Sequence, residues 1–251
     1  MRCPLIVRNT SEDVVTGHIV QTLRLLNPRW WLPDLLNKGL EAKRFERQIY
    51  RRFRIEPWVN QPRYPRELLP YEEGSTQVDT VVSWDNERTT VFIEAKYKSE
   101  LSASTANGDG NHGYPTDQLI RNIRVGLQTC DYFRDNALFE TNPRDFVVLL
   151  LTPIKGHPLV QRYRDESRLR ASIPHSDRLI GLPRKPFIGE IDYADIIEIF
   201  KHQSRFLTRA ERIAAESLTI YLQFKRSGLG FRMGNNRTPL PLIGDGRAGN
   251  S

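Results

Sequence analysis

Two neighbouring stretches near the middle of the chain carry the hydrophobic patterns of β-strands. Over residues 78–84, VDTVVSW, every second side chain falls on the same face of an extended strand, and residues 90–97, TVFIEAKY, carry a second apolar run. Residues 85–88, DNER, are turn formers, because Asp and Asn side chains hydrogen-bond their own backbone and tolerate left-handed geometry. The pattern predicts a β-hairpin.

Helical spacing occurs on both sides of this hairpin. Apolar side chains recur every three or four positions over residues 10–27, which predicts one helix before the hairpin. The same spacing over residues 116–130 predicts a helix after it, with Thr116 as the N-cap. Residues 146–151, FVVLLL, form a continuous apolar run that is typical of a strand buried on both faces. The predicted order is therefore helix, strand pair, helix and buried strand.

The segment between the first helix and the hairpin is rich in aromatic and basic residues. We expect a short helix over residues 30–40 and a second helix over residues 43–54, built around Phe45, Ile49 and Phe53. In that interpretation the aromatic side chains are core and the arginines form the solvated face of the helix. The alternative is that the basic and aromatic residues grip phosphates and stack the bases of a nucleic acid. A run of prolines then predicts an irregular connection into the hairpin.

The remainder of the chain is less regular. Residues 99–113 are small, polar and rich in glycine, which predicts a loop beside the hairpin. After the buried strand we expect a basic helix at 159–173, a short apolar strand or helix at 191–200 and a long amphipathic helix at 203–224. From residue 227 onward no apolar period survives, so a disordered or partner-binding tail is predicted.

Composition and charge narrow the classes of partner. The chain of 251 residues is 39% hydrophobic and 27% charged, as in an ordinary globular domain. Its formal net charge of +7 favours a polyanionic partner. No apolar run approaches the roughly 18 residues of a membrane span, and no secretory signal is recognisable. Cys3 and Cys130 are too few and too far apart for a disulfide framework or a zinc site. We therefore expect a cytoplasmic protein without a membrane partner.

Three charged side chains interrupt the apolar hairpin. Asp79 lies near the start of the first strand, and Glu94 and Lys96 lie two residues apart in the second, so that both point to one face. Asp79 can face them across the strand pair. Two carboxylates and an ammonium are costly to bury unless they pair or hold a cation, and carboxylate oxygens suit Mg²⁺ or Mn²⁺. The alternative is a salt bridge on a solvated sheet face.

This arrangement resembles a known family. Asp79, followed by Glu94-Ala95-Lys96, is similar to the core of the PD-(D/E)XK phosphodiesterase superfamily, which includes restriction endonucleases, RecB-type exonucleases and archaeal Holliday-junction resolvases. Val78 stands where the signature has its proline. The predicted element order over residues 11–152 matches the αβββαβ core of that superfamily. The resemblance implies that Asp79 and Glu94 bind a divalent metal and that Lys96 positions the attacking water.

The resemblance also assigns roles to residues outside the hairpin. In the superfamily a glutamate near the start of the preceding helix often completes the metal site, which implies Glu12, with Asp13 as the next choice. The alternative is that both acids only complement the helix dipole. A glutamine near the start of the following helix often helps to bind phosphate or water, which implies Gln118 as a further catalytic residue; its alternative is an exposed place in the first turn. The basic residues expected to contact nucleic acid are Lys98, Arg121 and Arg124.

We therefore predict an α/β fold with a restriction-endonuclease-like core, in which a central mixed sheet is flanked by helices. One domain is expected over residues 1–226, with the core at 11–152 and a C-terminal helical elaboration at 153–226, followed by a disordered tail at 227–251.

The predicted function is hydrolysis of phosphodiester bonds in DNA by a nuclease that depends on Mg²⁺ or Mn²⁺, within a phage-defence or DNA-repair system. The sequence does not separate DNA from RNA as the substrate. The alternative is a nucleic-acid-binding or protein-interaction subunit of a larger complex. In either case we expect a homo-oligomer or a protein partner.

Overall fold

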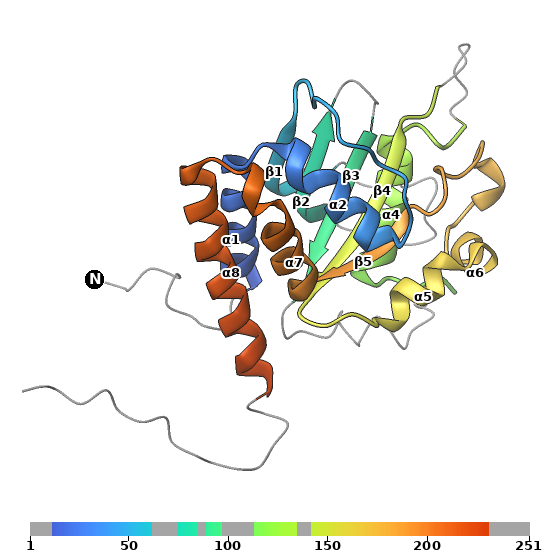
Figure 1. The fold of residues 1–251 in the computed structure, drawn as a ribbon. Coiled ribbons are helices and arrows are strands. Elements are labelled where there is room, and N and C mark those ends of the chain that lie inside the picture. The colour runs from blue at the N-terminus through green and yellow to red at the C-terminus, as the bar shows by residue number, and fades with distance from the viewer. Residues whose placement is uncertain (1–11, 62–74, 85–88, 97–112, 135–141, 231–251) are drawn as a thin grey trace, which may run out of the picture.

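The chain folds around a five-stranded mixed sheet with helices on both faces (Figure 1). The computed structural model describes residues 12–61, 75–84, 89–96, 113–134 and 142–230. The strands follow one another across the sheet in chain order, as β1 (Arg54–Gln61), β2 (Thr76–Trp84), β3 (Thr89–Ala95), β4 (Asp145–Thr152) and β5 (Ile188–Asp192). The first three strands pair antiparallel and the last three pair parallel. The predicted α/β class with a mixed sheet is confirmed.

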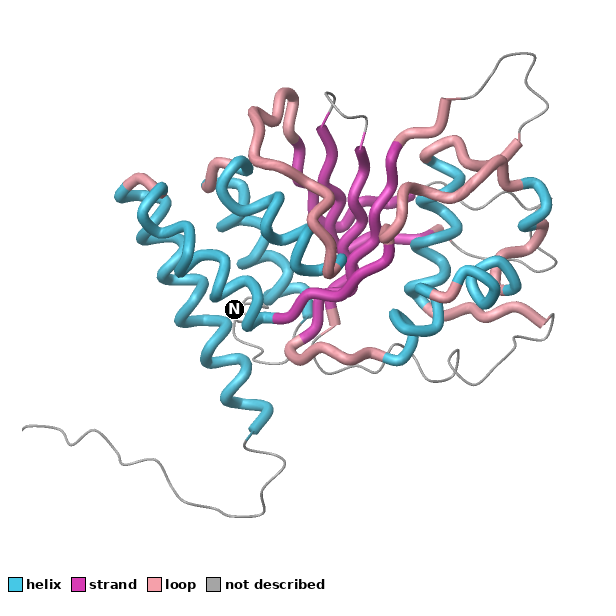
Figure 2. The backbone as a smooth tube through the Cα atoms, turned by 45° about the vertical axis from the view of Figure 1, so that its right-hand side comes forward, coloured by secondary structure: helices cyan, strands magenta, loops and turns pink. Residues whose placement is uncertain are grey.

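The helices form two layers, one on each side of the sheet (Figures 1 and 2). One layer contains α1 (Glu12–Leu25), α2 (Pro28–Leu40), α7 (Tyr193–Gln203) and α8 (Arg209–Gly230). The other contains α4 (Gln118–Thr129), α5 (Pro158–Arg164) and α6 (Glu166–Ala171). Two 3₁₀ turns, η3 (Ser176–Arg178) and η4 (Ser204–Phe206), connect later elements. No helix in the described part of the chain is long and apolar enough to cross a membrane.

The central strands β3 and β4 are buried on both faces, because each side of the sheet carries a helix layer. Alternate residues of β3 enter different cores: Ile93 packs in the core with α1 and α2, whereas Phe92 packs in the core with α4. The ring of Phe92 meets that of Phe146 edge-on at 5.1 Å between centroids. Burying each such side chain contributes about 1.5–3 kcal/mol to folding. The strand predicted from the run FVVLLL is confirmed as β4.

The predicted hairpin is confirmed as the antiparallel pair β2 and β3. Its register pairs Thr80 with Ile93 and Val82 with Val91. The turn residues 85–88 and Tyr97 lie outside the described residues. The hairpin therefore includes the central strand of the sheet, and Glu94 and Lys96 lie where that strand, β3, ends.

The helix predicted over residues 43–54 is wrong. Residues 43–50 have no regular structure, and β1 begins at Arg54. The side chain of Asn37 accounts for part of this path, because its Oδ1 accepts hydrogen bonds from the backbone N–H groups of Arg44 and Phe45 at 2.8 Å each. Ile49, expected in the core, is 70% exposed.

Three further predictions shift in the C-terminal half. The helix expected at 159–173 is two short helices, α5 and α6, because Asp165 breaks the first and caps the second. The single strand or helix expected at 191–200 is the end of β5 followed by α7, because Asp192 ends the strand and caps the helix through a reciprocal pair of hydrogen bonds with Asp195. The last helix begins later than predicted, at Arg209, and continues to Gly230, so residues 227–230 belong to α8 rather than to a tail. Residues 231–251 lie outside the described residues.

Candidate functional site

The structure brings Asp79, Glu94 and Lys96 together at the end of the central hairpin. Glu94 is the penultimate residue of β3, and Lys96 follows the strand directly. The antiparallel register that pairs Thr80 with Ile93 places Asp79 of β2 beside Glu94. Lys96 stays aligned with the sheet because its backbone N–H donates to Leu151 O of β4 at 2.8 Å. The pairing of two adjacent strands thus brings Asp79 and Glu94 side by side, with Lys96 directly after the strand.

Each charged group in the cluster has a defined contact. Lys96 Nζ lies 2.7 Å from Glu94 Oε1 and 3.8 Å from Glu12 Oε2. Asp79 Oδ2 accepts a hydrogen bond from the backbone N–H of Ala95 at 2.8 Å. Glu12 comes from the first turn of α1, so the helix before the hairpin reaches the cluster. The cluster contains three carboxylates and one ammonium.

Burial and the repulsion between neighbouring carboxylates shift the pKa values of the charged groups in this cluster. The side chain of Glu94 is 1% exposed; its burial and the neighbouring charge of Asp79 raise its pKa to about 7, although Lys96 and Asn122 oppose the shift. Burial also raises the pKa of Asp79, against the opposing effects of the Ala95 N–H and Lys96. Burial would lower the pKa of Lys96, but the surrounding carboxylates outweigh it and raise the pKa. Lys96 is therefore protonated at neutral pH, and the cluster holds more carboxylates than ammonium groups.

The sequence analysis missed one residue of the site, Asn122 on α4. Its Nδ2 donates to Glu94 Oε2 at 2.9 Å, while its Oδ1 is buried and has no hydrogen-bond partner among the described residues. Asn122 lies three positions after Leu119 and one before Ile123, on the helix stripe that packs against the sheet. The signal in the sequence was a polar residue within the apolar stripe of a predicted helix. In the structure, the side-chain amide of Asn122 holds one carboxylate oxygen of Glu94 in place.

Gln118 and Arg121 lie along the same helix but contact the beginning of β2. Gln118 Nε2 donates to Gln77 O at 3.2 Å, and Arg121 donates to Ser75 O at 3.5 Å. The N-cap of α4 is Asp117, whose side chain accepts from the Ile120 N–H, rather than the predicted Thr116. Gln118 is thus in the first turn of the helix, as expected, and its hydrogen bond ties the helix to the hairpin.

The prediction that Arg124 contacts nucleic acid is inconsistent with its position. Its side chain is fully buried between α4 and the segment after α6, where it donates to Ser172 O at 2.8 Å and to Pro115 O at 2.6 Å. The helix face that carries Arg124 is covered by α5 and α6, which the local sequence pattern did not indicate. Lys98 lies outside the described residues.

The cluster offers oxygen atoms of the kind that hard divalent cations take as ligands. Asp79 and Glu94 offer carboxylate oxygens whose pKa values are raised, and Asn122 Oδ1 is an orphaned oxygen beside them. Among the described residues, no group of three or more His, Cys, Asp or Glu side chains is arranged so that it could hold a metal ion. The third acid, Glu12, is linked to the carboxylate pair through the ammonium of Lys96.

Comparison with models of protein families, with curated proteins and with solved structures found no match. The resemblance to the PD-(D/E)XK superfamily therefore depends on the motif residues and on the order of the elements that carry them.

Proposed function

We propose that this protein is a metal-dependent nuclease of the PD-(D/E)XK type, with a restriction-endonuclease-like core, that hydrolyses phosphodiester bonds in DNA. The observation that carries the proposal is the meeting of Asp79, Glu94 and Lys96 at the end of a buried hairpin. A solvated salt bridge, the alternative interpretation, does not need a glutamate that is 1% exposed beside a second carboxylate. Clustered anions that are costly to bury are typical of a functional site.

The carboxylates define where a cation would be held. Asp79 and Glu94 would hold Mg²⁺ or Mn²⁺, with Glu12 and Asn122 Oδ1 as further oxygen donors nearby. When bound, such an ion polarises a phosphoryl oxygen and lowers the pKa of a coordinated water. The backbone N–H of Ala95 fixes Asp79, and the amide of Asn122 fixes Glu94, so both carboxylates are pre-oriented.

Lys96 has a different role, set by its charge. Because its pKa is raised, Lys96 keeps its proton at neutral pH and cannot act as the general base. Its Nζ can donate hydrogen bonds to a water or to a phosphate oxygen, and its positive charge stabilises the charge that develops on the phosphate in the transition state. Its 2.7 Å contact with Glu94 Oε1 holds the ammonium beside the carboxylate pair.

The test of this proposal is direct incubation of the full-length protein with linear, circular and single-stranded DNA, with Mg²⁺ and with EDTA. Products that appear only with Mg²⁺ support the proposal, and cleavage of circular DNA distinguishes an endonuclease from an exonuclease. The Asp79→Ala variant is the control for contaminating nuclease. Cleavage that continues in EDTA or in this variant would contradict the proposed site.

A second candidate function is a nucleic-acid-binding subunit that does not cleave. The observation that favours it is the internal compensation of Glu94 by Lys96, which gives the cluster a structural role without a metal. The same incubation separates the two functions: binding of DNA without any product, at every concentration of Mg²⁺ or Mn²⁺, would favour this second function.

A further inference from the structure

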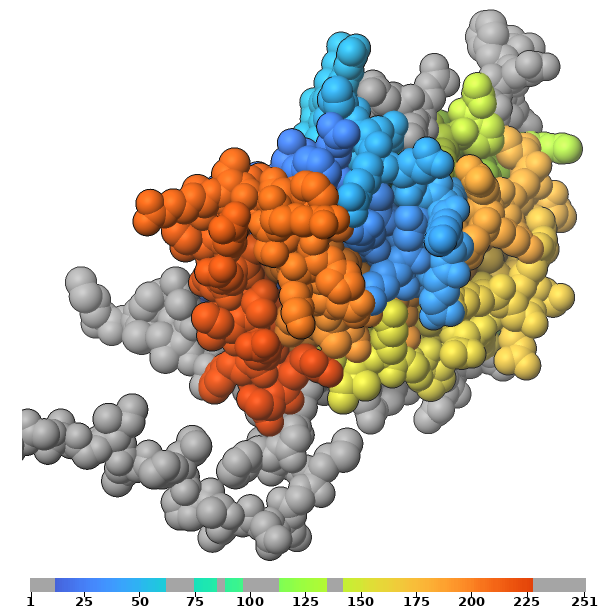
Figure 3. All heavy atoms as spheres, viewed as in Figure 1, coloured from blue at the N-terminus to red at the C-terminus, as the bar shows by residue number. Residues whose placement is uncertain are grey.

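A groove of about 780 Å³ lies between α2 and the end of α7, in the helix layer formed by α1, α2, α7 and α8. The orange segment of α7 and η4 adjoins the blue segment of α2 on the face seen in Figure 3. Ligand sites commonly have volumes of about 300–1,000 Å³. The proposed nuclease site does not use this groove, because Asn122, which holds Glu94, belongs to the helix layer on the other face of the sheet.

Two stacked aromatic rings at the rim of the groove make cation–π contacts with three arginines. Trp30 of α2 and Phe206 of η4 are parallel within 7°, with 4.6 Å between ring centroids. Arg29 lies over the Trp30 ring at 5.1 Å and Arg205 over the Phe206 ring at 4.7 Å. Arg47 lies within 5.8 Å of both rings. Cation–π contacts hold a guanidinium by its face, which leaves its edge N–H groups available to an anion.

The acids of the groove are already paired. Asp34 lies 3.3 Å from Arg47, and its carboxylate also accepts a hydrogen bond from Gln203. Glu198 pairs with Lys38 at 2.8 Å, and Glu41 lies 3.3 Å from Arg164. Each acidic side chain of the groove is therefore compensated by a cation.

The remaining cations have no such compensation. Within the described part of the chain, no carboxylate lies at ion-pair distance from Arg29, Lys43 or Arg205. Lys43 and Arg205 line the groove, and Arg29 stands at its rim beside Trp30. All three are exposed. The groove and its rim thus carry a surplus of positive charge on side chains that solvent can reach.

We propose that this groove, defined here by Lys43, Arg47, Arg205 and Phe206, binds the backbone of a single-stranded nucleic acid. Arginine forks match phosphate geometry, and Phe206, 37% exposed, offers an apolar edge to a base. A single strand is flexible and can follow a concave groove, whereas a duplex presents its phosphates on a stiff cylinder. The proposal holds whether or not the Glu94 cluster cleaves, because no residue of that cluster contributes to the groove.

The test measures binding of fluorescent oligo-dT by anisotropy in EDTA, so that cleavage does not enter the readout. Arg205→Ser and Lys43→Ser should each lower the affinity roughly tenfold, since each removes a charge-assisted contact. Each should also reduce the slope of log affinity against log salt by about 0.7. The control is Arg168→Ser, an exposed arginine on α6 in the other layer, which should leave affinity and slope unchanged. Phe206→Leu should weaken binding severalfold, whereas Phe224→Leu, an exposed phenylalanine on α8, should not.

Several outcomes would overturn the proposal. One is equal affinity in Arg205→Ser and Arg168→Ser at unchanged melting temperature. Another is duplex DNA that binds more tightly than oligo-dT and is weakened by the same substitutions. A third is polyglutamate that competes as well as the oligonucleotide, because the groove would then accept acidic peptides without regard to phosphate. Loss of cleavage with intact binding in EDTA would leave this inference standing and count only against the proposed nuclease.

Discussion

Two buried glutamates lie at the same level of the sheet, yet their surroundings differ in kind. Leu150 of β4 pairs with Glu94 of β3 on one side and with Glu190 of β5 on the other. Paired residues of neighbouring strands share a face, so both glutamates point toward the layer of α4, α5 and α6. Glu94 is 1% exposed and Glu190 is 5% exposed. Burial alone therefore does not distinguish them.

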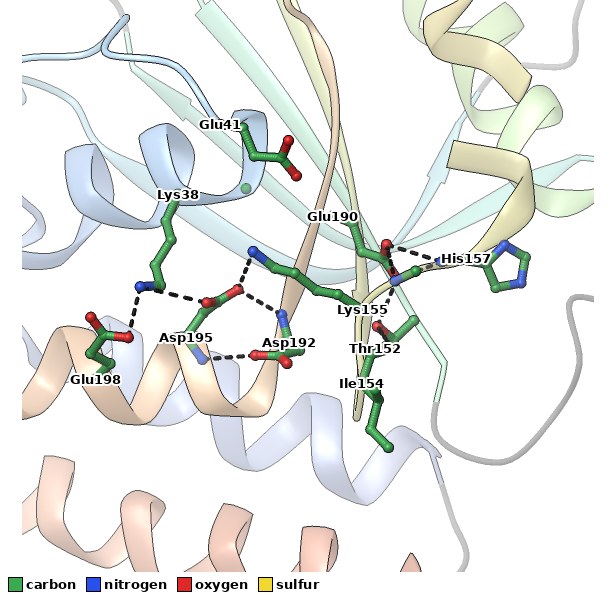
Figure 4. A network of polar contacts seen from close by, with 12 residues as sticks. Lys38, Glu41, Thr152, Ile154, Lys155, His157, Glu190, Asp192, Asp195 and Glu198 are labelled. Carbon is green, nitrogen blue, oxygen red and sulfur yellow. Dashed lines mark hydrogen bonds and ion pairs between the residues drawn. The ribbon is translucent and has the colours of Figure 1, made fainter. Parts of the chain in front are cut away.

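Glu190 is surrounded by neutral donors. It accepts hydrogen bonds from the Thr152 hydroxyl at 3.0 Å and from the backbone N–H groups of Gly156 at 2.8 Å and His157 at 3.1 Å (Figure 4). The nearby Lys155 turns away to Asp195, 2.7 Å distant. Glu190 thus fastens the loop between β4 and α5 to β5, and within the described ranges its carboxylate has hydrogen-bond donors but no ion-pair partner.

Glu94 has a second carboxylate as its neighbour. Asp79 contributes to the rise in its pKa, and the donors that oppose this rise, Lys96 and Asn122, do not cancel it. A buried glutamate that serves only to hold a loop in place can be satisfied by neutral hydrogen-bond donors, as Glu190 is. The difference teaches that the crowding of carboxylates, rather than the burial of one of them, is what supports the proposal of a cation site at Glu94.

The largest expected effect is on the rate of DNA cleavage, which substitution of Glu94 should lower and substitution of Glu190 should not. Glu94→Gln removes an anionic metal ligand and should lower the rate of single-turnover DNA cleavage at least about a thousandfold. Asp79→Ala should do the same. Glu190→Gln should leave that rate within about twofold, since the hydrogen bonds of the Glu190 side chain to described residues go to the end of β4 and the loop after it, and not to the Glu94 cluster. Equal losses in Glu94→Gln and Glu190→Gln, at equal folded fraction, would remove the distinction drawn here.

A smaller effect is expected from Lys96→Ala. Lys96 is proposed to act on the water and the transition state, so its loss should slow cleavage on the order of a hundredfold. The affinity for Mg²⁺, measured by calorimetry on the metal-free protein, should not fall, because Lys96 is not a ligand. Glu94→Gln should weaken both properties together. If Lys96→Ala and Glu94→Gln instead cause similar small drops in melting temperature and leave cleavage unchanged, the contact is a structural salt bridge.

Local rules were enough to place Asp79, Glu94 and Lys96. The parity of a strand sets which residues share a face, and the two strands of the hairpin are neighbours in the sequence, so no distant information is needed. The positions of Asn122 and Arg124 could not be predicted from such local rules. Both lie on parts of α4 that become buried only because β3 and the α5–α6 segment pack on the helix, and a single helix pattern does not reveal what covers it.

The helix predicted over residues 43–54 failed for the same reason. Phe45 and Phe53 recur at helical spacing, but Phe45 instead packs edge-on against Trp84 of β2, with 6.2 Å between centroids. Pro57 is the first of the prolines that predicted an irregular connection, yet it lies within β1, which is at the edge of the sheet, where a missing N–H is tolerated. Tertiary contacts thus overrode propensity at positions where the sequence pattern was ambiguous.

The stability of the protein provides a comparison that does not depend on activity. Glu190→Gln turns one acceptor oxygen into a donor that faces other donors, so it should lower the free energy of unfolding by about 1–3 kcal/mol. Glu41→Gln is the matched control, because that glutamate is exposed and its ion pair with Arg164 should contribute at most about 0.5 kcal/mol. Urea unfolding at neutral pH measures both. A Glu190→Gln variant as stable as Glu41→Gln would show that Glu190 does not fasten the loop.

The effect of pH on the metal-free protein is the most delicate test of the comparison. Burial and Asp79 raise the pKa of Glu94 from 4.5 to about 7, so the folded state binds this proton more tightly than the unfolded state does. Stability from this group is therefore present below about pH 4.5 and is lost as pH rises toward 7. Glu94→Gln cannot ionise and escapes that loss.

In EDTA, the free energy of unfolding of the wild-type protein relative to Glu94→Gln should therefore fall by about 1–3 kcal/mol between pH 5 and pH 8. Urea unfolding of both proteins at several pH values measures this difference. A difference that stays constant with pH, or that grows in favour of the wild type as pH rises, would mean that Lys96 fully compensates Glu94. The cluster would then resemble the neutral fastening at Glu190, and the physical reason for expecting a cation there would be gone.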